Sequence, residues 1–198
     1  MAPSAALLPL HEHLRRHARA IPDRTAYLWY GRALTWAELD AASDAFAARL
    51  QALGVQKGEP VALFMNNCPQ YLMAHYGIQK IGAIVCPCGP LNKEHELQYQ
   101  LDDLKARVIV AADVLLPVVE QVRAQTALEH VFVVRYAELL PDGEPSIAVP
   151  AELQAMRASA APAPAGCEDF LVAARTGERP AAVELSMDDV ALMTYTSG

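Results

Sequence analysis

The sequence predicts an α/β fold, built on a mostly parallel sheet with helices on both faces. Segments 61–65 and 83–86 are continuously apolar, as strands covered on both faces are, and similar segments follow at 107–111 and 131–134. Stretches with helical spacing of apolar residues stand between them, and this alternation is typical of a parallel sheet. With 198 residues, the chain is long enough for one core or for a large part of a bigger one.

Residues 1–58 predict a helix, a hairpin and a second helix with capping signals at both ends. Leucines in 5–20 recur at the spacing of one helix face, and two short strands follow around a glycine. Thr35 and Glu38 have the spacing of a capping box, in which each side chain binds the other residue's backbone N–H. Gly54 is expected to end this helix in a left-handed conformation. Its buried stripe is expected to consist of Leu39, Phe46, Leu50 and Leu53.

Residues 59–135 predict a β-α-β-α-β core. Apolar residues occur almost all round the helix expected at 69–80, which predicts that it is deeply packed. Asn92 is expected to cap the next helix, and residues 114–125 are expected to form another one. Residues 136–189, rich in proline and alanine over much of their length, predict an irregular connection with one short helix near its end.

Candidate ligand-binding segments are expected where the parallel strands end, because ligands of such sheets collect at that edge. Asn66, Asn67 and the segment 86–90 fall there, although turn chemistry alone also explains them. Segment 190–198 begins as an apolar run with the composition of a buried strand and ends in hydroxyl-bearing residues and a glycine. Hydroxyls and free backbone N–H groups at the end of a strand can hold phosphate, so this segment predicts a phosphate loop.

Charge and composition argue against several classes of partner. The formal net charge is −7, so binding of nucleic acid or of an anionic membrane surface is not expected. No apolar run approaches the ~20 residues of a membrane span, and no secretory signal is evident. His13 and His17 are four residues apart, but a solvated helix face is favoured over a metal site. Reduced thiols in a cytoplasmic protein, and no metal site, are expected for the cysteines Cys68, Cys86, Cys88 and Cys167.

The end of the chain resembles the phosphate loop of the adenylate-forming ligases, which include acyl-CoA synthetases, luciferases and peptide-synthetase adenylation domains. Thr194-Tyr195-Thr196-Ser197-Gly198 is similar to the first half of their Tyr-Thr-Ser-Gly-Thr-Thr-Gly-x-Pro-Lys sequence. The resemblance covers about residues 10–198, with Gly89 standing where many relatives have asparagine. Other segments resemble the family in the same order, namely Leu34–Leu39, Gly54–Ala62, Asn67–Pro69, Glu96–Leu104 and Asp188–Ala191.

The resemblance implies an AMP-forming acyl-CoA synthetase that uses ATP, Mg²⁺ and coenzyme A. A carboxylic acid, either a long-chain fatty acid or an aryl acid, would form an acyl-adenylate and then a CoA thioester. Thr196, Ser197 and Gly198 would contact the ATP phosphates, with Thr194 and Tyr195 supporting them. No catalytic residue and no metal ligand is carried over to any other position.

The resemblance also implies that residues 1–198 are a truncated N-terminal part of the AMP-binding domain, a piece of the family's large N-terminal domain. The second half of the loop, with its lysine, does not occur in the sequence, so this chain alone is expected to be inactive. Two alternatives stay open, a small Rossmann-like nucleotide-binding protein and a non-catalytic interaction module. None of these three hypotheses excludes a homodimer.

Overall fold

The computed structural model of the protein describes residues 7–143, 145, 147–158 and 161–196. Its elements, in chain order, are α1 (Leu10–Ala20), β1 (Thr25–Trp29), β2 (Arg32–Thr35), α2 (Trp36–Ala52), β3 (Pro60–Phe64), α3 (Pro69–Lys80), β4 (Ile84–Cys88), α4 (Glu94–Leu104), β5 (Val108–Ala112), the 3₁₀ turn η1 (Asp113–Leu115), α5 (Leu116–Arg123), β6 (His130–Val134), α6 (Ala151–Ala158), β7 (Glu168–Asp169) and α7 (Phe170–Ala173).

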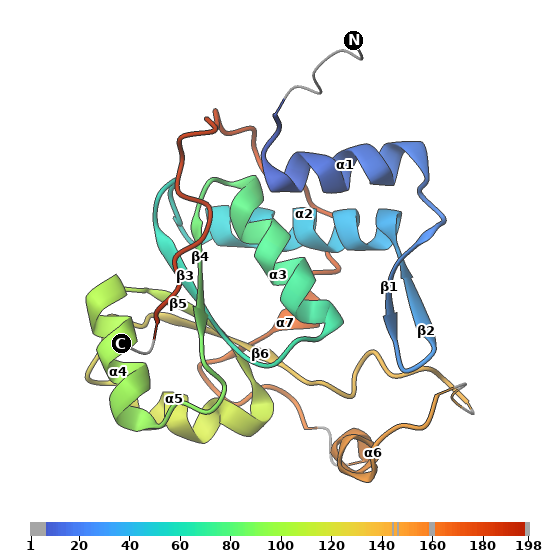
Figure 1. Cartoon of the computed structure of the whole chain (residues 1–198). Coiled ribbons are helices and arrows are strands. Elements are labelled where there is room, and N and C mark those ends of the chain that lie inside the picture. Colours follow the sequence, from blue (N-terminus) through green and yellow to red (C-terminus); the bar gives the residue numbers. More distant parts are fainter. Residues whose placement is uncertain (1–6, 144, 146, 159–160, 197–198) are drawn as a thin grey trace.

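Parallel strands form the central sheet, in the order β4-β3-β5-β6-β7 (Figure 1). Helices α1, α2, α3 and α7 pack on one face, and α4 and α5 pack on the other. Side chains alternate between the two faces, so that Leu63 belongs to the first core and Phe64 to the second. The fold class expected from the sequence is therefore confirmed.

Helix α2 has the ends that the sequence predicts. The Glu38 N–H donates to the Thr35 hydroxyl at 3.2 Å, and the Thr35 N–H donates to the Glu38 carboxylate at 2.8 Å. At the other end, Gly54 takes a φ of +79°, and the Val55 N–H donates to the Leu50 carbonyl at 3.0 Å. At both ends these bonds satisfy backbone groups that a helix would otherwise leave unpaired. Helix α2 therefore begins and ends at defined residues.

An aromatic cluster ties α2 to the sheet and to α7. The Phe46 side chain is fully buried, and its ring centroid lies 5.2 Å from that of Phe132 and 4.8 Å from that of Phe170. Gly77 allows α3 to approach α2 closely, because a Cβ there would lie 2.9 Å from the Ser43 carbonyl oxygen. This cluster and the close helix contact make α2 the centre of the first core.

A buried ion cluster joins α2 to α3. The Lys80 side chain is fully buried, and its Nζ lies 2.6 Å from a carboxylate oxygen of Asp40 and 2.6 Å from one of Asp44. Its third hydrogen bond goes to the Asp40 carbonyl at 2.8 Å, so every ammonium proton has an acceptor. Arg15 of α1 lies 3.6 Å from Asp44 and brings a second positive charge to the cluster.

Helix α1 buries only part of the stripe that its leucine spacing predicts, together with a histidine beside it. Leu7 and Leu10 are 82% and 51% exposed, whereas His11 and Leu14 are buried. The helix begins only at Leu10, so the expected stripe from residue 5 is interrupted. The inward position of His11 is what the sequence analysis missed, because a histidine carries no apolar signal.

Acid is expected to destabilise the protein through His11. Burial lowers the pKa of His11 from 6.5 to about 4; Arg15 and Lys80 also lower it, while Glu12 and Asp40 oppose them. Because the pKa is lower in the folded state, the stabilisation is present above pH 6.5 and is lost as the pH falls towards 4. We expect this group to account for a loss of roughly 2 kcal/mol in the free energy of unfolding between pH 7 and 4.

Urea unfolding at a series of pH values measures this effect in the variant His11→Gln. The variant is expected to be less stable at pH 7 but to lose less stability on acidification than the wild type. His13→Gln, on an exposed side of the same helix, is the matched control and is expected to follow the wild type. Equal acid sensitivity of His11→Gln and His13→Gln would contradict the assignment.

Helix α4 begins one residue later than expected, and Asn92 does not cap it. The N-cap is Lys93, whose backbone N–H donates to the Glu96 carboxylate at 2.9 Å. The Asn92 side chain instead donates to Gln100 at 3.0 Å and lies against Gly89, where a Cβ would come within 2.8 Å of it. Packing against the preceding turn therefore takes the Asn92 side chain away from the helix start.

The connection 136–189 is more structured than its composition predicts. It contains α6, the two-residue edge strand β7 and the short helix α7. Strand β7 is polar, and its side chains are ion-paired: Arg49 donates to both carboxylate oxygens of Glu168 at 2.8 and 2.9 Å, and Arg135 pairs with Asp169. These partners lie far away in the sequence, so no local pattern indicates the strand.

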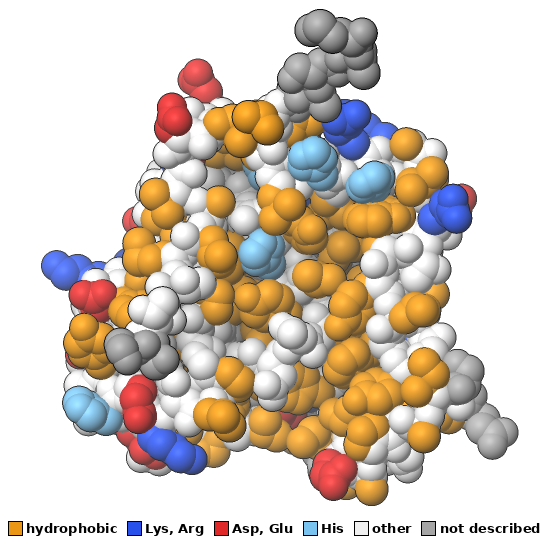
Figure 2. Space-filling view, in the orientation of Figure 1, with side chains coloured by type: hydrophobic (Ala, Val, Ile, Leu, Met, Phe, Trp, Pro, Cys, Tyr) orange, Lys and Arg blue, Asp and Glu red, His pale blue; other side chains and the backbone are white. Residues whose placement is uncertain are grey.

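Helix α3 is deeply packed, as expected, with every residue buried or partly buried. Tyr71, Leu72 and Tyr76 remain partly exposed, while Met73 and Ile78 are buried. Figure 2 shows hydrophobic side chains gathered on the face of the molecule over α3.

Of the helices described, none combines the length and the apolar composition that crossing a membrane requires.

The four cysteines are free thiols, as expected. Cys68, Cys86 and Cys88 are buried, and Cys167 is partly exposed. Burial raises the pKa of Cys68 and of Cys86 to about 11 and that of Cys88 to about 12. These three thiols therefore stay protonated at neutral pH and behave as small apolar side chains.

Candidate functional site

Polar surface contacts hold the segment that leads to the predicted phosphate loop, drawn in dark red in Figure 1. The Gln51 side chain exchanges two hydrogen bonds with the Ala181 backbone, at 3.0 and 2.8 Å. The Lys57 ammonium donates to the Glu184 carbonyl at 2.9 Å and pairs with Asp189 at 2.7 Å. These contacts carry the chain past α2 to the outer edge of β4.

The segment then joins the sheet beside β4. The Val85 N–H donates to the Ala191 carbonyl at 3.1 Å, and the Met193 N–H donates to the Val85 carbonyl at 2.9 Å. This pattern makes Leu192 a parallel partner of Val85. Because the pairing is parallel, the residues after Leu192 travel toward the edge where the other strands end, which is the position that a ligand-binding loop requires.

The expected buried strand at 190–193 is reduced to this single bridge and is exposed. Val190, Leu192 and Met193 are 54%, 46% and 40% exposed. Pro87 explains the short pairing: it is the next residue of β4 whose backbone nitrogen faces this side, and proline has no N–H to donate. The apolar composition reflects a position at the sheet edge and not in the core.

Tyr195 connects the start of the predicted loop to α4 by a hydrogen bond and a ring contact. Its hydroxyl donates to the Asp103 carboxylate at 2.5 Å, and its ring meets that of Tyr99 edge-on, with centroids 6.4 Å apart. Burial, the hydrogen bond from this hydroxyl and the charge of Asp103 all raise the pKa of Tyr195 well above its ordinary value. The phenol therefore stays protonated, and remains a hydrogen-bond donor, at neutral and mildly alkaline pH.

The other predicted site residues are partly described. Thr194 and Thr196 are exposed, so their hydroxyls are free to reach a ligand. Ser197 and Gly198 lie outside the described residues. The described part of the candidate site therefore offers two accessible hydroxyls on either side of an anchored tyrosine, a set that can donate hydrogen bonds to phosphate oxygens.

Neighbouring strand ends are occupied by bonds within the protein. The Asn66 N–H donates to the Tyr136 hydroxyl at 2.6 Å, and the Gln70 side chain donates to the Arg135 carbonyl at 2.9 Å. Cys86 lies within β4 and not beyond its end, because the strand continues to Cys88. These bonds occupy the Asn66 backbone, and the segments 66–67 and 86–90 stay candidates for lining a site.

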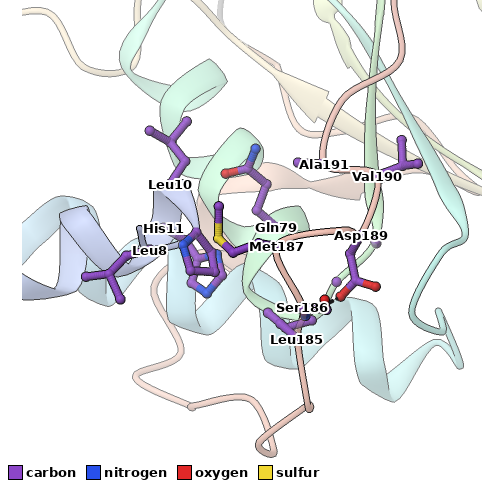
Figure 3. Close-up of a pocket in the computed structure, with 13 residues that line it drawn as sticks. Leu8, Leu10, His11, Gln79, Leu185, Ser186, Met187, Asp189, Val190 and Ala191 are labelled. Atoms are coloured by element: carbon purple, nitrogen blue, oxygen red, sulfur yellow. Dashed lines mark hydrogen bonds between the residues drawn. The ribbon is translucent and has the colours of Figure 1, made fainter. Parts of the chain in front are cut away.

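A cavity of about 140 Å³ lies between the start of α1, the end of α3 and the segment 185–191 (Figure 3). His11, Gln79, Ser186 and Asp189 contribute polar groups to the lining, and the other residues are mostly apolar. None of the residues 194–196 is among the described residues that line it. The cavity is therefore distinct from the candidate phosphate loop.

Sequence reasoning missed Asp103 and Tyr99, the two partners of Tyr195. They are four residues apart on α4 and so share one face of the helix. Their spacing fits an ordinary solvated helix face, and nothing local connects them with a segment more than 90 positions later. No sequence signal in this chain would have identified them.

The comparisons with known proteins decide the family. The family model described as "AMP-binding enzyme" matches residues 14–198. This chain belongs to that family. As a family member, it is 36% identical over 132 residues to a long-chain-fatty-acid–CoA ligase of Bacillus subtilis, covering 67% of this chain and 24% of the relative. It is 37% identical over 136 residues to the ligase of the same name from Salmonella typhimurium, covering 68% of this chain and 24% of the relative.

Solved structures agree with the fold of this family member. An anthranilate CoA ligase, AuaEII, in complex with anthranoyl-AMP superposes with a TM-score of 0.76 and 24% identity, over 95% of this chain and 32% of that one. The N-terminal domain of FACL13 from Mycobacterium tuberculosis gives a TM-score of 0.70 and 25% identity, over 97% of this chain and 42% of that one. The chain spans about a quarter of the length of the curated relatives it matches.

Proposed function

We propose that the protein to which this chain belongs is an ATP-dependent, AMP-forming carboxylic acid–CoA ligase that acts on long-chain fatty acids. Relatives named long-chain-fatty-acid–CoA ligase, at 36–37% identity, support this acid class over the aryl acids. A 4-coumarate–CoA ligase of Oryza sativa matches at 29% identity and supports aryl acids less strongly. A cytoplasmic location is part of the proposal and agrees with four free thiols.

The parallel bridge between Leu192 and Val85 is the observation that carries the proposal. It gives the segment the direction of the other strands, whose ends form the edge where ligands of such sheets collect, and Thr194 and Thr196, which follow the bridge, are exposed. Their hydroxyls, together with Ser197 and the backbone of Gly198, would donate hydrogen bonds to the phosphates of ATP. Charge develops on phosphate oxygens during phosphoryl and adenylyl transfer, so donors placed there lower the barrier.

The proposed reaction has two steps. A carboxylate oxygen of the acid attacks the α-phosphorus of ATP, the bond to pyrophosphate breaks, and an acyl-adenylate results. The thiol of coenzyme A then attacks the acyl carbon, and AMP leaves with the pair of electrons of the broken bond. In this proposal Mg²⁺ enters as the complex with ATP, and no metal ligand is assigned among residues 1–198.

Acid-dependent exchange of pyrophosphate into ATP by the full-length protein tests the proposal. Exchange with palmitate is expected to exceed exchange with benzoate or 4-coumarate. Thr196→Ala is expected to raise the KM for ATP about tenfold through loss of a hydrogen bond to a charged group, whereas Thr126→Ala, after α5, serves as the control. A protein that exchanges pyrophosphate with none of these acids would contradict the proposed function.

We also propose that the 198 residues alone do not form acyl-adenylate, because they span only about a quarter of the length of relatives named as long-chain-fatty-acid–CoA ligases. Exchange assays on the isolated chain are expected to give the background rate with every acid. An acid-dependent rate from this chain would overturn that part of the proposal and leave the function of the full protein unaffected.

A further inference from the structure

Of the described loop residues 194–196, Tyr195 alone has a side-chain hydrogen bond to the rest of the chain. Its hydroxyl is bound by Asp103, and its ring edge rests on Tyr99. The two partners are one helical turn apart, so the ring is held at two separated points and its rotation is restricted.

The support beneath this contact is rigid. Leu97 and Leu101, on the inner side of α4, are fully buried in the second core. Asp103 lies two residues after Leu101, in the last turn of the helix, and projects to the exposed side. The Tyr195 ring is thus connected through α4 to the sheet, independently of the backbone bridge at Leu192.

We propose that Asp103 is a positioning residue for the ATP phosphates: by holding Tyr195 against α4, its carboxylate fixes Thr194 and Thr196 in the orientation that receives ATP. This inference rests on the proposed function. Asp103 does not touch the nucleotide and acts only through Tyr195. The raised pKa of Tyr195 keeps the phenol protonated, so the contact persists over the pH range of the assay.

If Asp103 acted on ATP only through its negative charge, its removal would be expected to have the opposite effect on ATP binding. Asp102 and Asp103 both place negative charge on α4 near a segment expected to bind an anion. If repulsion of ATP were their main effect, removing either charge would tighten ATP binding. Positioning requires instead that removal of Asp103 weakens binding, and that removal of Asp102 does not.

The test is a double-mutant cycle in the full-length protein, read by the KM for ATP in palmitate-dependent pyrophosphate exchange. Asp103→Ala and Tyr195→Phe are each expected to raise this KM about tenfold, because each removes the same charged hydrogen bond. The double variant is expected to show no more than the single effect, since the two residues act as one unit. Asp103→Asn, which keeps an acceptor oxygen, is expected to recover most of the loss.

Asp102→Ala is the matched control, with the same charge removed one position earlier on the same helix. The KM for palmitate and the melting temperature are expected to stay at wild-type values in all variants, which separates positioning from general destabilisation. The proposal is overturned if Asp103→Ala behaves like Asp102→Ala, if ATP binds more tightly to it, or if the effects of the two single changes multiply in the double variant.

Amide hydrogen exchange of residues 190–196 provides a readout that does not depend on the reaction. Exchange is expected to be faster in Asp103→Ala and in Tyr195→Phe than in the wild type, and unchanged in Asp102→Ala. A wild-type protein without exchange activity would count against the proposed function alone. Unchanged amide exchange in Asp103→Ala would count against the positioning role alone.

Discussion

Replacing Lys80 with alanine is expected to lower the free energy of unfolding by about 3 kcal/mol or more, because two partly buried carboxylates would lose their counter-charge. The Lys80 side chain is fully buried between Asp40 and Asp44, with both Nζ–oxygen distances at 2.6 Å. Arg15 and Arg179 lie 3.6 and 3.9 Å from Asp44, so the positive charges that would remain are close to only one of the two carboxylates. Urea unfolding at pH 7 measures the change.

Controls separate the loss of charge from the loss of packing. Lys80→Met keeps most of the side-chain volume and is expected to remain strongly destabilised, while adding Asp40→Asn and Asp44→Asn should restore much of the stability. Lys93→Ala removes an exposed lysine and is expected to stay within about 0.5 kcal/mol of the wild type. Similar unfolding curves for Lys80→Ala and Lys93→Ala would show that the cluster contributes little.

Phe46→Ala is expected to cost about 3–5 kcal/mol of stability, because it leaves a cavity at the centre of the first core. The ring is fully buried and contacts Phe132 of β6 and Phe170 of α7, so three elements lose packing together. Guanidinium unfolding monitored by circular dichroism gives the change in stability.

Phe46→Leu fills part of that cavity and is expected to cost less than half as much as the alanine variant. Val172→Ala, on the exposed side of α7 at 71% exposure, is the surface control and is expected to change stability by less than about 0.5 kcal/mol. A Phe46→Ala protein as stable as Val172→Ala would contradict the central place of this ring in the core.

The sequence predicts the parts of the fold that depend on local patterns. Apolar runs place β3 to β6, and the Thr35–Glu38 pair and Gly54 place both ends of α2, because capping and strand burial are encoded within a few residues. Strand β7 was missed because its polar residues are stabilised by Arg49 and Arg135, which lie far away in the chain. Long-range ion pairs leave no periodic signal.

The candidate site could likewise be predicted only where its signal is local in the sequence. The hydroxyl-rich sequence indicated a phosphate loop, and the parallel approach along β4 agrees with that indication. The burial of 190–193 was wrong, since apolar composition does not distinguish a covered strand from a sheet edge where Pro87 interrupts the pairing. Asp103 could be found only from the three-dimensional contact.

The attachment of the last segment has a consequence for the order in which the molecule assembles. Lys57 and Glu184 are separated by 127 positions, so this contact closes a long loop and forms slowly compared with contacts between successive elements. Strands β3 to β6 can pair as they emerge during synthesis, whereas the segment that bridges to β4 at Leu192 follows all of them in the chain. This edge of the sheet would therefore be completed only after the strands that support it exist, which protects the exposed apolar run at 190–193 from pairing with a wrong strand.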